Sequence, residues 1–323
     1  MNISQLYFID SLSVGVRCGD KWIADQIPGL FEALGFVRGE YKPSNSKVSV
    51  EFASHSNEKA FPIQSSGIYS VGILDFFQSN DYLYVTEGKS FLGVNLRNNS
   101  GFSLLHNSFW QKPLYFKVSL LIVEFILLLW RYGFYELHAA GLAKEGKGLL
   151  LVGPSGSGKS SLALSLIRQG WHYLSDDMLI LRRTPLGVEA LPLRKYFKVK
   201  RSLTNKYPEL THLLEKPLEL LNEEAYIYVD GTYPNQSVQR CIPRTIIFPR
   251  ITHKGESQIG PLKQSEAFIN LFRSNCYGMY FDHQIARQRL EIMKDLVYQA
   301  DCYEMSVGLD LYEDPTKILE LLP

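Results

Sequence analysis

The sequence has few of the features that direct a protein to the cell exterior, to a membrane or to nucleic acid. Its four cysteines are scattered over 323 residues, with no C-x-x-C pair, which is typical of free thiols in a reducing compartment. The first residues, Met-Asn-Ile-Ser-Gln, lack the basic and apolar regions of a signal peptide. A formal net charge of +1 provides no attraction to nucleic acid or to an acidic membrane. We therefore expect a cytoplasmic protein that binds neither.

The chain also lacks an apolar run long enough to cross a membrane. Val118–Trp130 is apolar on nearly every face, but a spanning helix needs about 20 such residues. Glu124 interrupts this run and Arg131 closes it. The pattern predicts a helix buried between two layers of the fold.

Length and composition indicate two domains. With 46% hydrophobic residues the chain can form packed cores, and Gln111-Lys-Pro113 is the expected seam. Residues 1–110 contain short β-type runs, one helical run and polar turns, but no catalytic motif. We expect a smaller α+β domain there, with a role in recognising a substrate or partner. Residues 111–323 are expected to form the catalytic domain.

A glycine-rich segment, Gly153–Ser160, follows the apolar run Gly148–Val152. Its spacing, a glycine, four residues and then Gly-Lys-Ser, is that of a phosphate-binding loop. Glycines let backbone N–H groups face phosphate oxygens, and the positive end of the next helix attracts anions. The pattern predicts binding of a nucleoside triphosphate by Gly153, Ser155, Gly156, Ser157, Gly158, Lys159, Ser160 and Ser161.

In such a loop Lys159 reaches the β- and γ-phosphates and the Ser160 hydroxyl holds Mg²⁺. The alternative is a Gly/Ser-rich turn that matches by chance. A β-type run before the loop and an apolar-periodic helix after it favour the phosphate-binding interpretation.

A hairpin is expected immediately before the loop. Two β-capable runs flank Lys144-Glu-Gly-Lys147, and a turn centred on Glu145-Gly146 pairs residues whose numbers sum to 291. His138 then lies opposite Gly153, beside the bound phosphates. A slip of one residue would turn His138 to the other face.

Two adjacent carboxylates, Asp176 and Asp177, follow the helix after the loop. At a strand end they can serve as a metal ligand and a catalytic base. A solvated acidic turn is the alternative. Asp230, after the apolar residues Tyr226–Val229, is a second candidate for the Mg²⁺ ligand.

Several cations lie further along the chain. Arg194–Arg201 holds five within eight residues, a pattern typical of a solvated face that beside a phosphate site would neutralise charge. Arg240, Arg244 and Arg250 are further candidates for contact with a phosphoryl group, and the sequence does not rank them.

The block from His138 to Asp177 resembles the catalytic domain of the HPr kinase/phosphorylase family. That family has, in order, a His-Gly-type strand, a hairpin, a Gly-Lys-Ser loop, a helix ending in Arg-x-Gly, and paired aspartates. Here they are His138-Ala-Ala-Gly141, Gly153–Ser160, Arg168-Gln-Gly170 and Asp176-Asp177. The resemblance implies an α/β fold with a mixed sheet around a P-loop phosphotransferase core, as in HPr kinase and PEP carboxykinase.

The resemblance also implies roles for individual residues. Asp176 matches the aspartate that takes the proton of the acceptor serine. The resemblance selects Asp177 over Asp230 as the Mg²⁺ ligand that acts together with Ser160. Lys159 matches the phosphate ligand, and His138 a residue next to the catalytic aspartate.

Two departures from the family concern the acceptor. Ser161 stands where the family usually has glutamate, and the later Glu-Val-Arg-Gly segment has no counterpart between residues 200 and 250. Relatives with such losses include kinases of lasso-peptide precursors. The expectation is an ATP- and Mg²⁺-dependent serine kinase acting on a peptide or protein, with homo-oligomer formation left open. The alternative is an ATP-binding regulatory or interaction module without turnover.

Overall fold

The computed structural model describes residues 3–40, 46–57, 67–200, 207–210, 224–252, 255–275 and 282–323. The chain divides into two compact units, Met1–Tyr132 (unit 1) and Gly133–Pro323 (unit 2). The boundary therefore lies after residue 132 and not at the expected seam near residue 111. The reason is helix α2 (Leu114–Trp130), whose Phe125 ring packs edge-on against Phe31, 5.0 Å away, in the core of unit 1. The predicted apolar helix thus completes the N-terminal unit.

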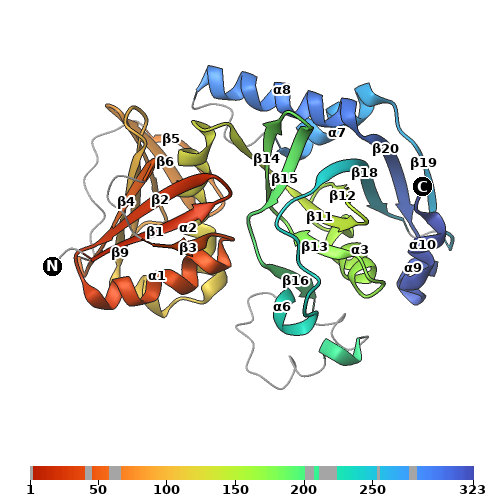
Figure 1. Ribbon diagram of the computed structural model, residues 1–323, viewed down its shortest axis with the longest axis horizontal. Helices are drawn as coiled ribbons and strands as arrows, with labels where there is room; N and C mark the ends of the chain where they lie inside the picture. Colours follow the sequence, from red (N-terminus) through yellow and green to blue (C-terminus); the bar gives the residue numbers. More distant parts are fainter. Residues whose placement is uncertain are drawn as a thin grey trace. The chain divides into compact units, whose positions relative to one another are not determined.

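Unit 1 is a nine-stranded mixed sheet with the order β3-β1-β2-β4-β9-β8-β7-β6-β5. Helices α1 (Lys21–Ala33) and α2 pack against it (Figure 1). Phe31 is also in ring contact with Tyr7 and Phe52, so the aromatic residues form the centre of this core. The other elements are β1 (Ile3–Ile9), β2 (Leu12–Cys18), β3 (Val37–Gly39), β4 (Val48–His55), β5 (Gly67–Val71), β6 (Leu74–Ser79), β7 (Tyr82–Thr86), β8 (Phe91–Asn95), β9 (Ser100–His106) and η2 (Asn107–Gln111).

Helix α2 is almost entirely buried, including Glu124, and is 17 residues long. No helix in the part of the chain that the structure describes combines the length and the apolar character needed to cross a bilayer.

Unit 2 contains a six-stranded sheet with the order β13-β11-β12-β18-β20-β19. The neighbours β12, β18 and β20 are parallel, whereas β11 and β19 are antiparallel to the strands beside them, so the sheet is mixed. A three-stranded sheet, β10-β14-β15, and a two-stranded sheet, β16-β17, complete the unit. The expected α/β class with mixed sheets is confirmed.

The elements of unit 2 are β10 (Phe134–Leu137), β11 (Ala139–Lys144), β12 (Lys147–Val152), α3 (Lys159–Ile167), β13 (His172–Ser175), β14 (Leu179–Thr184), β15 (Gly187–Pro192), β16 (Tyr196–Lys200), η3 (Pro208–Leu210), β17 (Glu224–Tyr228), α6 (Val229–Thr232), β18 (Ile242–Ile251), β19 (Gln258–Pro261), α7 (Gln264–Asn275), α8 (His283–Gln299), β20 (Asp301–Val307), α9 (Leu309–Glu313), η4 (Pro315–Lys317) and α10 (Ile318–Leu321).

Strands β12 and β18 are buried on both faces because helices cover the sheet on each side. Leu149 and Leu151 of β12 join the core cluster that contains α3, while Leu150 between them is equally buried. Figure 1 shows α3 below the strands and α7 and α8 above them. This layering leaves the carboxyl ends of β12 and β18 as a shared edge, which is where ligands bind in open α/β sheets.

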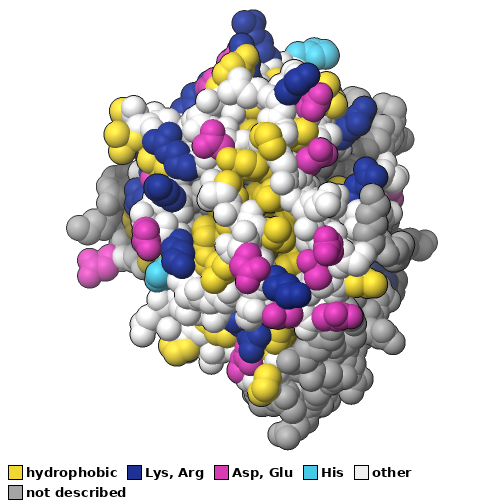
Figure 2. All heavy atoms as spheres, turned by 90° about the vertical axis from the view of Figure 1, so that its right-hand side faces the viewer, with side chains coloured by type: hydrophobic (Ala, Val, Ile, Leu, Met, Phe, Trp, Pro, Cys, Tyr) yellow, Lys and Arg dark blue, Asp and Glu magenta, His cyan; other side chains and the backbone are white. Residues whose placement is uncertain are grey.

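The outer face near β19, β20 and the C-terminal helices is of mixed charge. On the face that Figure 2 shows, Lys and Arg side chains lie among those of Asp and Glu, with hydrophobic side chains between them. This mixture matches the small formal net charge of the whole sequence.

Candidate active site

The glycine-rich loop, defined here as Gly153–Gly158, connects β12 to α3 as the sequence predicts. Gly156 and Gly158 have φ values of 83° and 99°, a left-handed conformation that only glycine adopts freely. Gly158 is the residue that caps α3, and as a glycine it makes no side-chain cap hydrogen bond. The first N–H groups of a helix have no partner within the helix, so those at the start of α3 suit an anion.

Lys159 and Ser157 lie within this loop region and are buried. The Lys159 ammonium donates to the carbonyl oxygens of Gly153, at 2.7 Å, and Pro154, at 3.0 Å. Burial lowers the pKa of Lys159, and the charges of Asp177 and Asp176 oppose that shift. Ser157 Oγ is buried without a hydrogen-bond partner in the described part of the chain.

The other predicted loop residues differ in exposure. Ser155 and Gly156 are exposed, while Ser160 and Ser161 are partly buried at the start of α3. The Ser161 carbonyl oxygen accepts a hydrogen bond from Ser165 Oγ, inside the helix.

The hairpin before the loop has the predicted register. Ala139 pairs with Val152 and Lys144 with Lys147, and both pairs sum to 291. Glu145 and Gly146 both have positive φ, as a two-residue turn of this kind requires. His138, one residue before the first pair, directs its ring toward Asp177. Its Nδ1 lies 2.7 Å from the Asp177 carbonyl oxygen and 3.2 Å from its Oδ1.

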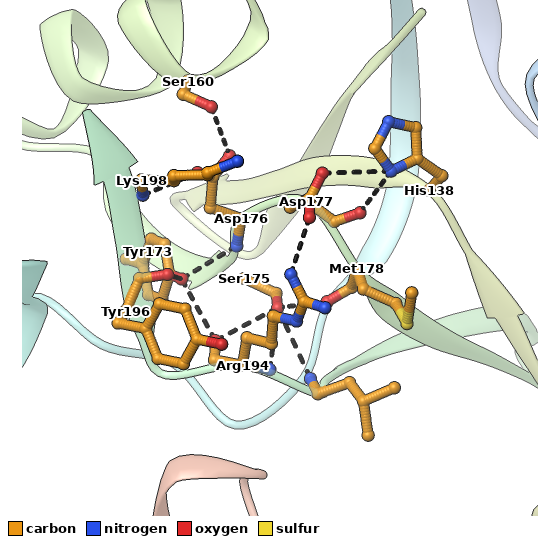
Figure 3. Close-up of polar contacts among 11 residues, drawn as sticks. His138, Ser160, Tyr173, Ser175, Asp176, Asp177, Met178, Arg194, Tyr196 and Lys198 are labelled. Carbon is orange, nitrogen blue, oxygen red and sulfur yellow. Dashed lines mark hydrogen bonds and ion pairs between the residues drawn. The ribbon is translucent and has the colours of Figure 1, made fainter. Parts of the chain in front are cut away.

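Asp176 lies directly after β13 and is almost fully buried. Its Oδ1 accepts a hydrogen bond from Ser160 Oγ at 3.0 Å, and its Oδ2 accepts one from the Lys198 backbone N–H at 3.2 Å (Figure 3). Burial and the charge of Asp177 raise the pKa of Asp176 to about 6, although Ser160, Lys198 and Lys159 lower it. A positive charge added near Asp176 would therefore stabilise its ionised form.

Asp177 points the other way. It has a φ of 64°, a left-handed conformation uncommon outside glycine, asparagine and aspartate. Its side chain is 35% exposed and forms an ion pair with Arg194 Nη1 at 2.6 Å, and its Oδ1 contacts His138 Nδ1. Burial lowers the pKa of His138, so at neutral pH this second contact is made by a neutral imidazole. Burial alone would raise the pKa of Asp177, but Arg194, His138 and Lys159 outweigh it, and the pKa is lowered.

These contacts divide the two carboxylates differently from the roles that the resemblance implies. Asp176, expected as the base, is the carboxylate that bonds to Ser160, whereas Asp177, expected as a Mg²⁺ ligand together with Ser160, contacts His138 (Figure 3). The reason is the left-handed backbone at Asp177, which turns the two side chains in different directions. The expected neighbourhood of His138 and a carboxylate is found, but with the second aspartate.

The cation run contributes two residues to this region. Arg194 contacts Asp177, and the backbone of Lys198 contacts Asp176. The end of the run, Arg201, and the Lys200 side chain lie outside the described residues. Arg240 instead lies 4.0 Å from Glu189. The second candidate for the metal ligand, Asp230, is an exposed residue of α6 whose Oδ1 accepts a hydrogen bond from Ser237, away from Ser160.

Three further residues position the site and were not found from the sequence. Tyr173 Oη accepts a hydrogen bond from the Asp176 N–H, and Ser175 Oγ contacts the backbone of Met178 and of Arg194. Asn275, at the end of α7, accepts a hydrogen bond from the His138 N–H across 137 residues of sequence. Only Tyr173 and Ser175 carried a local signal, because they lie on the strand that ends at Asp176.

The residues present fit a nucleotide with Mg²⁺. A β-carbon on Gly153 would lie 2.8 Å from Ser157 Oγ, so the loop closes tightly around this hydroxyl, which has no hydrogen-bond partner in the described part of the chain. The described residues contain no cluster of three or more metal-ligating side chains. One hydroxyl and one carboxylate, Ser160 and Asp176, nonetheless suit Mg²⁺, which keeps several waters and takes its other ligands from substrate phosphates.

Comparisons with known proteins place the chain near one family. No protein-family model matches it. The HPr kinase/phosphorylase of Mycoplasmopsis pulmonis is 32% identical over 172 residues, which is 52% of this chain and 48% of that protein. That of Chlorobaculum tepidum is 35% identical over 72 residues, 22% of this chain and 19% of that protein. The chain thus spans less than half of these relatives, and its relationship to HPr kinase/phosphorylases is distant.

Among solved structures, the HPr(Ser) kinase/phosphatase of Coxiella burnetii has a TM-score of 0.30 and 12% sequence identity to this chain. The match covers 57% of this chain and 95% of that one.

Proposed function

We propose, from the distant relationship to the HPr kinase/phosphorylases and from the site in unit 2, that the protein is an ATP- and Mg²⁺-dependent kinase. Its acceptor is a serine hydroxyl of a peptide or protein. The observation that carries the proposal is the convergence of the glycine-rich loop, the Ser160–Asp176 pair and the Asp177–His138 pair in one region.

The contacts support a division of labour between the two aspartates. Ser160 and Asp176 are the residues that would hold Mg²⁺, which when bound neutralises charge on the phosphates. Asp176 is only 1% exposed, so it is closed to an acceptor arriving from solvent, whereas the Asp177 side chain is 35% exposed. Asp177 is therefore the carboxylate within reach of an acceptor hydroxyl.

In the proposed step, Asp177 accepts the proton of the serine hydroxyl while the serine oxygen forms its bond to the γ-phosphorus. The bond from that phosphorus to the β–γ bridging oxygen breaks, and ADP leaves. His138 and Arg194 hold the Asp177 carboxylate in place, and the charge of Arg194 keeps it ionised at neutral pH. Lys159 supplies positive charge at the loop.

The test is transfer of label from ATP carrying a labelled γ-phosphoryl group. The purified full chain is incubated with lysate of the source organism, and the labelled species is identified by mass. We expect label on a serine of a peptide or protein with the wild-type chain, and none with Lys159→Ala. ATP binding without any labelled product would contradict the proposal and favour an ATP-binding regulatory module.

A further inference from the structure

Strand β18 brings an exposed hydrophobic residue to the side of the glycine-rich loop. β18 is parallel to β12 and next to it in the sheet, so the carboxyl ends of both strands lie at the same edge. β12 ends in the loop, and β18 ends at Ile251. Ile251 is 53% exposed, one of the more exposed large hydrophobic side chains in the described part of the chain.

Ile251 is in contact range of the loop. A β-carbon on Gly158 would lie 3.6 Å from Ile251 Cγ1 and 3.8 Å from Cδ1, and one on Gly153 would lie 3.5 Å from the Pro249 carbonyl oxygen. Ile251 is also aligned with Val307 of the parallel strand β20. Aligned residues of neighbouring strands share a face of the sheet, so Ile251 and Val307 form an apolar shelf beside the start of α3.

The sheet order separates this shelf from the two aspartates. Asp176 and Asp177 follow β13, which with β11 lies on one side of β12, while β18 lies on the other side. For a phosphate chain in the loop whose γ-phosphoryl group faces Asp177, the side of the loop away from the aspartates is the side of β18. The group at the other end of the phosphate chain of a nucleotide is the nucleoside.

We propose that the apolar shelf of Ile251 and Val307 is the nucleoside subsite, where the face of the base packs on Ile251. This inference rests on the proposed function, because it takes a nucleotide in the loop as its starting point. Single exposed hydrophobic residues are normal on protein surfaces. Ile251 differs from Ile269 of α7, which is 46% exposed, because Ile251 adjoins the loop that the proposal fills with phosphates.

The experiment compares two ligands that share a phosphate chain and differ in the nucleoside. Binding of Mg²⁺-ATP and of Mg²⁺-tripolyphosphate to the full chain is measured by titration calorimetry for the wild type, Ile251→Ala and Ile251→Val. Ile269→Ala is the matched control. Each substitution is uncharged, so none changes the field at the phosphates. Ile251→Ala removes three carbon groups, of which a base packed on one face would cover roughly half the surface, so ATP binding is expected to weaken about five- to tenfold, with a smaller loss for Ile251→Val.

The expected result is weaker ATP binding for the Ile251 variants, unchanged tripolyphosphate binding, and wild-type behaviour for Ile269→Ala. Wild-type ATP affinity in Ile251→Ala would overturn the subsite. Equal losses for both ligands would also overturn it, because Ile251 would then act on the loop alone. A wild-type chain that binds neither ligand would instead overturn the proposed function itself.

Discussion

Glu124 in unit 1 and Asp176 in unit 2 are both buried carboxyl groups with raised pKa values, in very different surroundings. Glu124 is fully buried among the apolar residues of α2, and burial raises its pKa to about 8. Its hydrogen-bond partner is Ser103, and its second oxygen has none in the described part of the chain. Asp176 has a second carboxylate, a lysine and a hydroxyl close by, and its pKa is raised to about 6.

The difference separates a structural acid from a candidate catalytic one. Burial and the Ser103 hydroxyl set the pKa of Glu124, so a protonated carboxyl group is the stable form at neutral pH and has little to offer a ligand. Around Asp176 lie charges of both signs, those of Asp177 and Lys159, and a bound cation would favour the ionised form of Asp176. Perturbed pKa values mark functional sites when specific charge partners accompany burial.

The largest expected effect is that of substituting Asp177 on the rate of phosphoryl transfer. Asp177→Asn keeps the shape of the side chain but removes the proposed base, so phosphoryl transfer should fall about 10³-fold, within the range of general base catalysis. Single-turnover transfer from labelled ATP measures it, and calorimetry should find ATP binding retained.

The matched control is Asp230→Asn, which alters the other aspartate considered from the sequence. Asp230 is exposed and bonds to Ser237, so turnover should be unchanged. Normal turnover of Asp177→Asn would remove the proposed role of this carboxylate.

The next effect concerns the stability of unit 1. The pKa of Glu124 is about 8 in the folded state and near 4.5 in the unfolded state, so the folded state holds a proton that the unfolded state releases in between. Stability therefore falls as pH rises from about 4.5 to 8. Glu124→Gln does not titrate, and its stability relative to the wild type should rise by about 3 kcal/mol between pH 5 and pH 8.

Hydrogen exchange of α2 peptides at the two pH values measures this change within unit 1. Exchange of α3 peptides in unit 2 is the internal control and should be the same in both proteins. Equal pH dependence of α2 in the wild type and the variant would show that Glu124 is ionised in the fold.

The corresponding substitution in unit 2, Asp176→Asn, should raise stability by slightly less than Glu124→Gln does, and it should impair the binding of Mg²⁺ with ATP. The pKa of Asp176 rises from 3.8 to about 6 on folding, so its contribution to stability is lost as pH rises across that interval. Without metal, Asp176→Asn should stabilise the chain by about 2–3 kcal/mol at pH 7.5 and by much less at pH 4. Melting curves at both pH values measure the gain.

The same variant should lose the additional stability that Mg²⁺ with ATP gives the wild type, because a neutral amide is a poor Mg²⁺ ligand. A variant that is less stable than the wild type at pH 7.5 would show that Asp176 is not a strained group in the fold.

The parts of this picture that depend on local spacing could be predicted from the sequence. The loop, the helix after it and the 291 register of the hairpin follow from residues close in sequence, and Glu145-Gly146 determines the turn. The burial of Val118–Trp130 follows from its composition alone.

The features that depend on packing between residues far apart in the sequence could not be predicted from it. Which unit contains α2 is decided by ring contacts such as Phe125 with Phe31, more than 90 residues away. Asn275 meets His138 only because α7 returns to β10. The orientation of Asp177 depends on one left-handed backbone angle, which a pair of adjacent aspartates does not reveal.

The smallest expected effect is the change in stability of unit 1 when the hydrogen bond from Ser103 to Glu124 is removed. Ser103→Ala removes the hydroxyl that lowers the pKa of Glu124, so that pKa should rise further above about 8. The loss of one buried hydrogen bond should destabilise unit 1 by about 1 kcal/mol, visible as faster exchange of α2 peptides at pH 7. Ser100→Ala, at a partly buried serine of the same strand that bonds to Asn98, should change exchange by less than about 0.5 kcal/mol. Phosphoryl transfer should be unaffected in both variants, because neither serine belongs to unit 2. A loss of transfer in Ser103→Ala would show that the buried acid of unit 1 contributes to function, and the contrast between the two acids would no longer hold.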